Sequence, residues 1–284
     1  MIEGVGTGAA PETATIYVRQ PGRRGGLEDL KEIWAYRELL YFLTWREVKV
    51  RYKQTVLGAA WAIMQPLFTM AVFSLVFGRL ARMPSDGIPY PIWSYAALLP
   101  WQFFTQALSS ASGSLVGNAN LIRKVYFPRA IAPASSVLFG LVDFSLAFVV
   151  LLAMMVYFGR RLTWEVVLLP LFLGLAVMTA LGAGLWLSAL TVRYRDFRFV
   201  VPFLNQLWLF ATPVIYPSSL LPGPWRMLSG LNPMTGAVEG FRWCLLGTSR
   251  PGAMLVFSAT VAVVLLGSGA LYFRTVERSF ADEV

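Results

Sequence analysis

Six apolar segments dominate the pattern of hydrophobic and polar positions along the 284-residue chain. They cover residues 57–78, 92–116, 130–158, 165–192, 199–216 and 253–273. A helix of about 20 apolar residues crosses roughly 30 Å of hydrocarbon, and nearly all six segments meet this length. The segment 199–216 is the shortest and carries a proline towards each end. The pattern therefore predicts an all-α integral membrane protein with six transmembrane helices.

The composition agrees with this prediction, because 57% of the residues are hydrophobic, 14% are charged and the mean hydropathy is +0.60. A soluble domain typically has about 25% charged residues. The chain leaves no room for a separate soluble domain of more than about 60 residues, so we expect one membrane domain over 57–276. The net charge of +9 does not indicate a nucleic-acid partner, because the basic residues flank the apolar segments.

The distribution of lysine and arginine predicts the topology. With the N-terminus placed in the cytoplasm, 17 basic residues fall on the cytoplasmic side and 7 on the opposite side. Loops on the cytoplasmic side carry an excess of basic residues, so we expect both termini to be cytoplasmic. Residues 1–26 lack an apolar core and are predicted to be a disordered cytoplasmic tail, neither a cleavable signal nor a span. Residues 277–284 form a second, short cytoplasmic tail.

The chain shows no sequence signature of catalytic chemistry. Cys244 is its single cysteine and histidine is absent, which excludes intrachain disulfides and metal sites built from cysteine and histidine. The sequence contains no Gly-x-x-x-x-Gly-Lys-Ser/Thr nucleotide loop, no Gly-x-Ser-x-Gly nucleophile elbow and no acidic cluster within an apolar segment. We expect no catalytic site, no bound cofactor and no metal in this chain.

Residues 27–56 are predicted to form an amphipathic helix before the first span. Its apolar and aromatic positions are spaced by three, four or seven residues, as on one helical face. They are Leu30, Trp34, Tyr41, Trp45, Val48 and Tyr52. Such a helix lies in the headgroup plane. It is either a simple anchor to anionic lipid or a docking face, and Glu32, Glu38 and Glu47 favour a protein partner.

A second cytoplasmic segment, residues 118–129, has the same mixed character. Arg123, Lys124 and Arg129 surround Tyr126 in a short link between two spans. We interpret this segment as an elbow that a protein partner moves.

Prolines and polar residues inside the spans predict kinked helices with polar faces. Proline bends a helix and frees a carbonyl, which lipid tolerates only where protein or water satisfies the backbone. Asp143 is the lone carboxylate deep in a span, and an intramembrane acid faces the interior of its bundle. A structural hydrogen bond and a role in transport are both open for Asp143.

Residues 217–252 are too broken by proline to span the bilayer and too apolar for a plain loop. We predict two short helices, 225–230 and 235–246, that dip back into the outer leaflet as a re-entrant lid. Asn232 before Pro233 indicates a helix start. Glu239 and Arg242 are spaced to pair on one face.

Aromatic residues make up 14% of the chain, and many lie within spans. Six of them are candidates to line a path for a substrate: Trp61, Phe68, Phe203, Trp208, Phe210 and Tyr216. Aromatic belts and lipid-facing bulk explain many of them. Sugar rings also present C–H faces that stack on tryptophan and tyrosine, while glutamine, asparagine and serine hydrogen-bond the hydroxyls. A polysaccharide path would use this mixture.

Four stretches resemble the permease subunits of ATP-binding-cassette exporters of polysaccharide and polyol phosphate. They are REVKVRYKQTVLGAAWAIMQPL at 46–67, YRDF at 194–197, TPVIYP at 212–217 and LNPMTGAVEGFRW at 231–243. The resemblance covers about residues 28–275 and is strongest to the permeases that export lipid-linked O-antigen polysaccharide in Gram-negative bacteria.

This resemblance implies a homodimer in the bacterial inner membrane, bound to two copies of a separate ATPase that holds ATP and magnesium. The path would lie at the dimer axis, lined chiefly by the first and fifth spans. Residues 30–53 would be the interface helix and 118–129 the coupling segment. The periplasmic gate would be 225–246, and its candidate residues are Pro224, Trp225, Asn232, Pro233, Glu239 and Arg242.

Three alternatives remain open at this point. The cargo can be capsular polysaccharide or teichoic acid rather than O-antigen, or the chain can export drugs or small lipids within the same superfamily. A membrane-embedded transferase acting on a lipid-linked sugar is an alternative of another class. Such an enzyme usually needs a histidine or a carboxylate cluster as its base, and this sequence offers neither.

Overall fold

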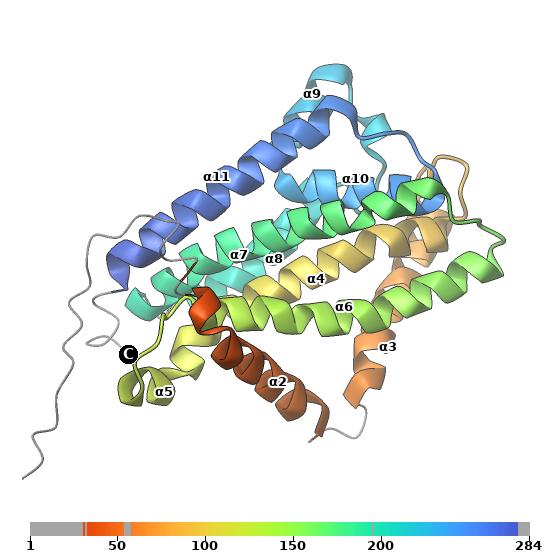
Figure 1. The fold of residues 1–284 in the computed structure, drawn as a ribbon. Helices are drawn as coiled ribbons and strands as arrows, with labels where there is room; N and C mark the ends of the chain where they lie inside the picture. The colour runs from red at the N-terminus through yellow and green to blue at the C-terminus, as the bar shows by residue number, and fades with distance from the viewer. Residues whose placement is uncertain (1–30, 32, 54–57, 195, 278–284) are drawn as a thin grey trace, which may run out of the picture.

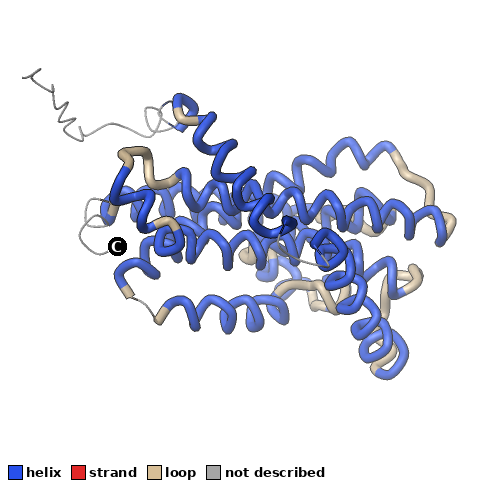
Figure 2. Tube along the Cα trace, turned by 90° about the horizontal axis from the view of Figure 1, so that it is seen from below, coloured by secondary structure: helices blue, strands red, loops and turns tan. Residues whose placement is uncertain are grey.

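The computed structural model describes all residues except 1–30, 32, 54–57, 195 and 278–284. Within this part the chain is all-α, without a strand, as predicted (Figures 1 and 2). The elements are α2 (Arg37–Lys53), α3 (Gly58–Phe73), η1 (Ser74–Leu80), α4 (Tyr90–Gly117), α5 (Ala119–Lys124), α6 (Ile131–Tyr157), η2 (Trp164–Leu168), α7 (Leu169–Arg193), α8 (Phe197–Ala211), η3 (Ser218–Leu220), α9 (Gly223–Ser229), α10 (Pro233–Leu246) and α11 (Gly252–Val276).

The helices follow the predicted apolar segments closely, with one exception. The segment 199–216 was predicted to be helical to its end, but α8 stops at Ala211. Prolines 213 and 217 lack the backbone N–H that a continuing helix needs, and the chain between them is non-helical. The last five residues of that predicted span are therefore a loop.

Among the described residues, four helical stretches are long and apolar enough to cross a membrane: Ala60–Leu80, Ile131–Tyr157, Trp164–Arg193 and Gly252–Val276. Such a set is typical of a multi-pass membrane protein. Helix α4 has the length of a span but is less apolar, and α8 is an apolar helix of 15 residues. The count of six spans remains a prediction.

Helix α4 forms the centre of the bundle, packed against α6, α7, α10 and α3 (Figure 1). Its large side chains Trp93, Tyr95 and Phe104 are completely buried. Ser94, Ser112 and Ser114 donate to carbonyls of their own helix; for example, Ser114 Oγ donates to Ala111 O at 2.7 Å. Protein rather than lipid therefore surrounds α4, which explains why this helix tolerates polar residues.

Glycines bring α7, α10 and α11 into close contact. A Cβ atom on Gly269 of α11 would lie 2.4 Å from the carbonyl oxygen of Gly182 on α7. A Cβ atom on Gly240 of α10 would lie 2.0 Å from the ring of Phe172. Small residues at helix crossings allow backbones to approach, so α10 is held tightly between its neighbours.

Helices α2, α3 and α8 lie at the periphery. Helix α2 runs along the outside of the bundle beside α6 (Figures 1 and 2). Residues 31 and 33–35, just before α2, are also helical. Both ends of the predicted helix 27–56, including Leu30, and the predicted tail 1–26 lie outside the described residues. In α8 only Val201 is buried, while α3 has little buried surface. These two helices therefore expose most of their side chains.

Candidate functional site

A cleft of about 440 Å³ lies between α3, α4, α6 and α8, next to the last turn of α2. Its wall carries polar side chains although the helices that form it are largely apolar. These side chains are Arg51, Gln65, Gln102, Thr105, Gln106, Ser109, Asp143 and Asn205. Amide and hydroxyl groups both donate and accept hydrogen bonds, and Phe103 and Phe144 add aromatic surface. Such a wall suits a ligand that carries many hydroxyl groups.

Asp143 is the acidic residue of this cleft and is only 8% exposed. Tyr52 Oη donates to its Oδ1 atom, and Gln106 Nε2 donates to its Oδ2 atom. Arg51 Nη2 lies 3.2 Å from the same Oδ2 atom. Asp143 therefore makes structural hydrogen bonds, which is one of the two roles that the sequence allowed. The sequence did not reveal its cation, because Arg51 lies 92 positions away on a helix outside the span.

Helix α2 has two further polar links to the bundle. Arg46 Nη2 donates to Asn118 Oδ1, and Ser136 Oγ donates to Glu47 Oε1 at 3.1 Å. Burial raises the pKa of Glu47, and the bonds from Ser136 and the charge of Arg46 offset part of this rise. Burial and the nearby Asp143 raise the pKa of Tyr52, so its hydroxyl stays protonated and donates at neutral pH.

The aromatic stripe predicted on α2 divides into two parts. Trp34, Tyr41 and Trp45 point outward, with Tyr41 69% exposed. Further along the same stripe Val48 is buried and Tyr52 reaches Asp143. The first part of the stripe is open to lipid or to a partner, whereas the second part binds the bundle itself.

The segment 118–129 packs beside α2 at one end of the bundle. Leu43 of α2 belongs to one apolar cluster with Ile122 and Phe127. Arg123, Lys124 and Tyr126 are exposed next to this cluster. Arg129 is instead tied to the end of α11, because its backbone N–H donates to Glu277 Oε1 at 3.0 Å and its Nη1 donates to Glu277 O at 2.6 Å. Those predicted coupling residues that the structure describes thus share one end of the molecule.

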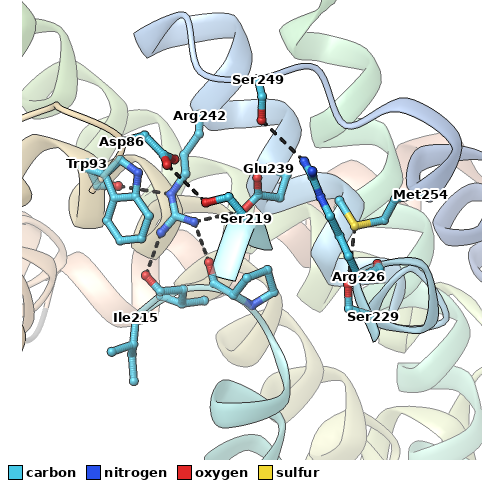
Figure 3. Close-up of polar contacts among 12 residues, drawn as sticks. Asp86, Trp93, Ile215, Ser219, Arg226, Ser229, Glu239, Arg242, Ser249 and Met254 are labelled. Atoms are coloured by element: carbon cyan, nitrogen blue, oxygen red, sulfur yellow. Dashed lines mark hydrogen bonds and ion pairs between the residues drawn. The ribbon is translucent and has the colours of Figure 1, made fainter. Parts of the chain in front are cut away.

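Arg242 holds the non-helical loop 212–217 (Figure 3). Its side chain is 1% exposed and donates to the carbonyls of Pro213, Val214 and Trp93. The guanidinium lies 3.4 Å from the centroid of the Trp93 ring, and Nη1 lies 3.1 Å from Glu239 Oε1. The predicted pairing of Glu239 with Arg242 is confirmed, but both side chains are buried in the core.

Tyr90 supports the same loop from α4, since its hydroxyl donates to Ile215 O at 2.8 Å. Three consecutive carbonyls, of residues 213 to 215, thus receive side-chain donors from α10 and α4. Non-helical backbone within a bundle needs such donors. Sequence reasoning missed the roles of Tyr90 and Trp93, because nothing in the local pattern connects them to this loop.

Asn232 joins α8 to α10. Its Oδ1 atom caps α10 by accepting from the N–H of Met234 at 3.1 Å, which confirms the predicted helix start at Pro233. The same atom accepts from Trp208 Nε1 at 2.9 Å, and Nδ2 donates to Thr212 Oγ1 at 2.8 Å. The predicted path residue Trp208 and the predicted gate residue Asn232 are therefore in contact.

Helix α9 lies at the outer end of the bundle, against α11 (Figure 1). Pro224 and Trp225 are exposed on it. Arg226 Nη2 lies 3.5 Å from Ser249 Oγ, and Ser229 Oγ lies 3.4 Å from Met254 Sδ (Figure 3). Contacts along one side of α9 leave its tryptophan open to the surroundings.

The aromatic path candidates lie mainly on the two helices that flank the cleft. Trp61 and Phe68 on α3 and Phe203 and Phe210 on α8 are exposed. Tyr216 is half-buried, and its hydroxyl donates to Phe210 O at 3.2 Å. Trp208 is half-buried too, with its ring edge-on to Phe104 at 4.9 Å between centroids. None of the six candidates lines the cleft, and four of them are exposed on the two helices that contribute other residues to its wall.

Comparison with known proteins gives a consistent picture. The family model described as "ABC-2 type transporter" matches residues 38–246. The O-antigen export system permease protein RfbA of Myxococcus xanthus is 31% identical over 259 residues, which cover 90% of this chain and 98% of that protein. The polysialic acid transport protein KpsM of Escherichia coli is 22% identical over 240 residues, covering 82% and 92%. The matched range extends from α2 through α10 and includes every residue of the cleft.

Proposed function

The chain belongs to the ABC-2 type transporter family of membrane proteins, and from this premise we propose that it is the permease subunit of an ATP-driven polysaccharide exporter. Its cargo would be lipid-linked O-antigen polysaccharide, moved from the cytoplasm to the periplasm across the inner membrane. The observation that carries this proposal is the cleft between α3, α4, α6 and α8, whose wall combines amide and hydroxyl groups with the rings of Phe103 and Phe144. Capsular polysaccharide is the second candidate, favoured by the similarity to the polysialic acid transport protein.

We take α4 and α8 to complete six spans, with both termini in the cytoplasm. Helix α4 crosses inside the protein and needs little apolar surface. Helix α8 covers about 22 Å at 1.5 Å per residue, and the loop 212–217 continues towards the periplasmic side. Helices α9 and α10 then form the lid, with α10 buried as its fixed part and α9 as its exposed part.

A second copy of the chain would close the path. Helices α3 and α8 expose the aromatic residues Trp61, Phe68, Phe203 and Phe210, and the cleft lies between these helices. In a homodimer that pairs these surfaces, two clefts would face each other along one axis. Rings then offer stacking surfaces and the cleft offers amide groups, so a polar polymer crosses without contact with lipid.

Two ATPase subunits would dock at the end of the bundle where α2 and α5 meet. The exposed Tyr41 and Trp45 of α2, with Trp34 just before it, would form the contact surface. Arg123 and Lys124 of α5 and the adjacent Tyr126 would complete it. ATP and magnesium would bind to those subunits. ATP shifts the permease between states only if the ATPase binds the two states with different affinity.

The proposal is tested by reconstitution. The permease is copurified with its neighbouring ATPase, placed in vesicles with lipid-linked glycan, and the glycan that becomes accessible on the far side is measured with and without ATP. We expect ATP-dependent movement that requires both subunits. Movement by this chain alone, or an intact complex that hydrolyses ATP but moves no glycan, would refute the proposal.

A further inference from the structure

The carboxylate of Asp143 connects α2 to the wall of the cleft. Tyr52 donates to its Oδ1 atom, while its Oδ2 atom accepts from Gln106 and lies 3.2 Å from Arg51 Nη2. Tyr52 and Arg51 belong to α2, and Gln106 belongs to α4. The buried carboxylate of Asp143 thus contacts both α2, which has an exposed aromatic face, and the cleft in which we place the sugar.

This arrangement limits how α2 can move. A buried carboxylate that loses its donors is strongly destabilised, so Arg51 and Tyr52 can leave Asp143 only if other donors take their place. The cleft beside Asp143 is the source of such donors, because a ligand bound there lies next to the same oxygen atoms. Sugar hydroxyls donate hydrogen bonds to carboxylates, and Gln65 and Gln102 can bind the remaining hydroxyls.

We propose that Asp143 is a hydrogen-bond acceptor for which the α2 donors Arg51 and Tyr52 compete with hydroxyl groups of a sugar bound in the cleft. The inference rests on the proposed function, since it takes the sugar to be part of the exported glycan and α2 to dock on the ATPase. Coupling between two sites is reciprocal. A sugar in the cleft therefore loosens the last turn of α2, and a released α2 binds the sugar more tightly.

The charges favour a neutral sugar over a phosphate group. Arg51 is already paired with Asp143, so its charge is largely neutralised. A phosphate would have to displace the carboxylate from Arg51 while lying beside that carboxylate. A hydroxyl group replaces the donors of Asp143 without adding a negative charge. The ligand class of this site is therefore a neutral, hydroxyl-rich sugar residue.

The other links of α2 allow its last turn to move separately. Arg46 bonds to Asn118 and Glu47 bonds to Ser136 about one turn before Arg51. The Arg51 side chain is 34% exposed, so it can turn away from the cleft without crossing the core. The earlier links can hold α2 on the bundle while the final turn releases Asp143.

Two substitutions with opposite expected signs test this competition in the reconstituted complex with its ATPase. The readout is the glycan concentration that gives half-maximal stimulation of ATP hydrolysis, expressed relative to each variant's own unstimulated rate. Tyr52→Phe removes one competing donor, so half-maximal stimulation should occur at about one third of the wild-type glycan concentration, or below. Asp143→Asn removes the charged acceptor, so that concentration should rise about tenfold or more.

A matched control separates competition from a loss of structure. Ser145→Ala removes a hydroxyl of α6 that lies outside the cleft and bonds only to Leu141 O in its own helix. It should not shift the half-maximal concentration. The probes are the purified lipid-linked glycan, the neutral oligosaccharide released from it, and the carrier phosphate without sugar. The first two should show the dependence on Tyr52, and the carrier phosphate should not.

The outcomes distinguish this inference from the function on which it rests. If the wild-type complex moves no glycan, both fail. If it moves glycan but Tyr52→Phe and Asp143→Asn shift the response in the same direction or not at all, the competition is wrong and the function stands. A Tyr52-dependent shift with carrier phosphate alone would overturn the neutral-sugar assignment. Should Asp143→Asn fail to assemble, the direction of the Tyr52→Phe shift decides.

Discussion

Replacing Arg242 tests how the chain holds the non-helical loop 212–217 inside the bundle. The guanidinium donates to the carbonyls of Pro213 and Val214, pairs with Glu239 and lies over the Trp93 ring. Arg242→Leu places an apolar side chain at this buried position and removes every one of these interactions. Both carbonyls and the buried carboxylate are then left without this donor.

The expected loss follows from those orphaned groups. A buried polar group without a partner costs about 1–3 kcal/mol, and removing one partner of a buried ion pair costs about 3–5 kcal/mol. The terms overlap because one guanidinium serves all partners. We therefore expect Arg242→Leu to reduce the free energy of unfolding by about 3–5 kcal/mol, a large share of the 5–15 kcal/mol typical of a folded protein.

Two further variants separate charge from geometry. Arg242→Lys keeps the charge but loses the planar fork that reaches two carbonyls at once and its stacking on Trp93, so we expect a loss of about 2 kcal/mol. The double variant Glu239→Gln with Arg242→Leu removes the unpaired carboxylate. It should be less destabilised than Arg242→Leu alone.

Cys244 provides the assay. It is the single cysteine, it lies two residues after Arg242 on α10, and it is 0% exposed. The rate at which a maleimide labels this thiol in detergent reports how often α10 opens. A loss of about 3–5 kcal/mol corresponds to labelling that is faster by at least about a hundredfold, at tenfold for each 1.4 kcal/mol. If Arg242→Leu labels at the wild-type rate and unfolds at the wild-type temperature, the loop does not depend on Arg242.

Three other predictions follow from the packing, from the charge of α2 and from the docking surface. Gly240→Ala should lower the unfolding temperature and cost about 2 kcal/mol or more, because a Cβ atom would lie 2.0 Å from the Phe172 ring, whereas Gly113→Ala meets open space and serves as the control. Burial raises the pKa of Glu47, so between its ordinary and its raised pKa the folded state binds more protons than the unfolded state. The free energy of unfolding should therefore fall as the pH rises through this window. Glu47→Gln should remove this pH dependence from the thermal unfolding temperature measured from about pH 4 to 8. Arg123→Glu with Lys124→Glu should uncouple ATP hydrolysis from glycan movement in vesicles, and unchanged coupling would show that this exposed segment does not touch the ATPase.

The helices were predictable from sequence because hydropathy records the need to cross lipid or to pack in a core. The bounds of α6, α7 and α11 fall within a few residues of the predicted segments. Helix α8 was predicted too long. A run of apolar residues can be a helix or a loop, and here it is a loop whose carbonyls accept hydrogen bonds from side chains of other helices. The proline pair at 213 and 217 was the local signal for that loop.

The cleft was only partly predictable. Its polar residues were visible as glutamines, serines and a lone aspartate within spans, but their convergence depends on how four helices pack. The pairing of Asp143 with Arg51 and Tyr52 joins positions more than 90 residues apart. The helical spacing over residues 30–52 placed Tyr52 on one stripe with Trp34. The packing of α2 against α6 separates the outward part of that stripe from the inward part.

Two of the stretches that resemble polysaccharide exporters meet at Arg242. TPVIYP supplies the carbonyls of Pro213 and Val214, and LNPMTGAVEGFRW supplies the arginine that binds them and the asparagine that bonds to Trp208 and Thr212. Their joint presence is explained by the need to satisfy non-helical backbone inside a membrane bundle, whatever polymer is carried. Cargo preference should therefore be altered by substitutions at the cleft positions Gln65, Gln102 and Asn205, while substitutions at Arg242 or Asn232 should reduce the amount of folded protein for every cargo.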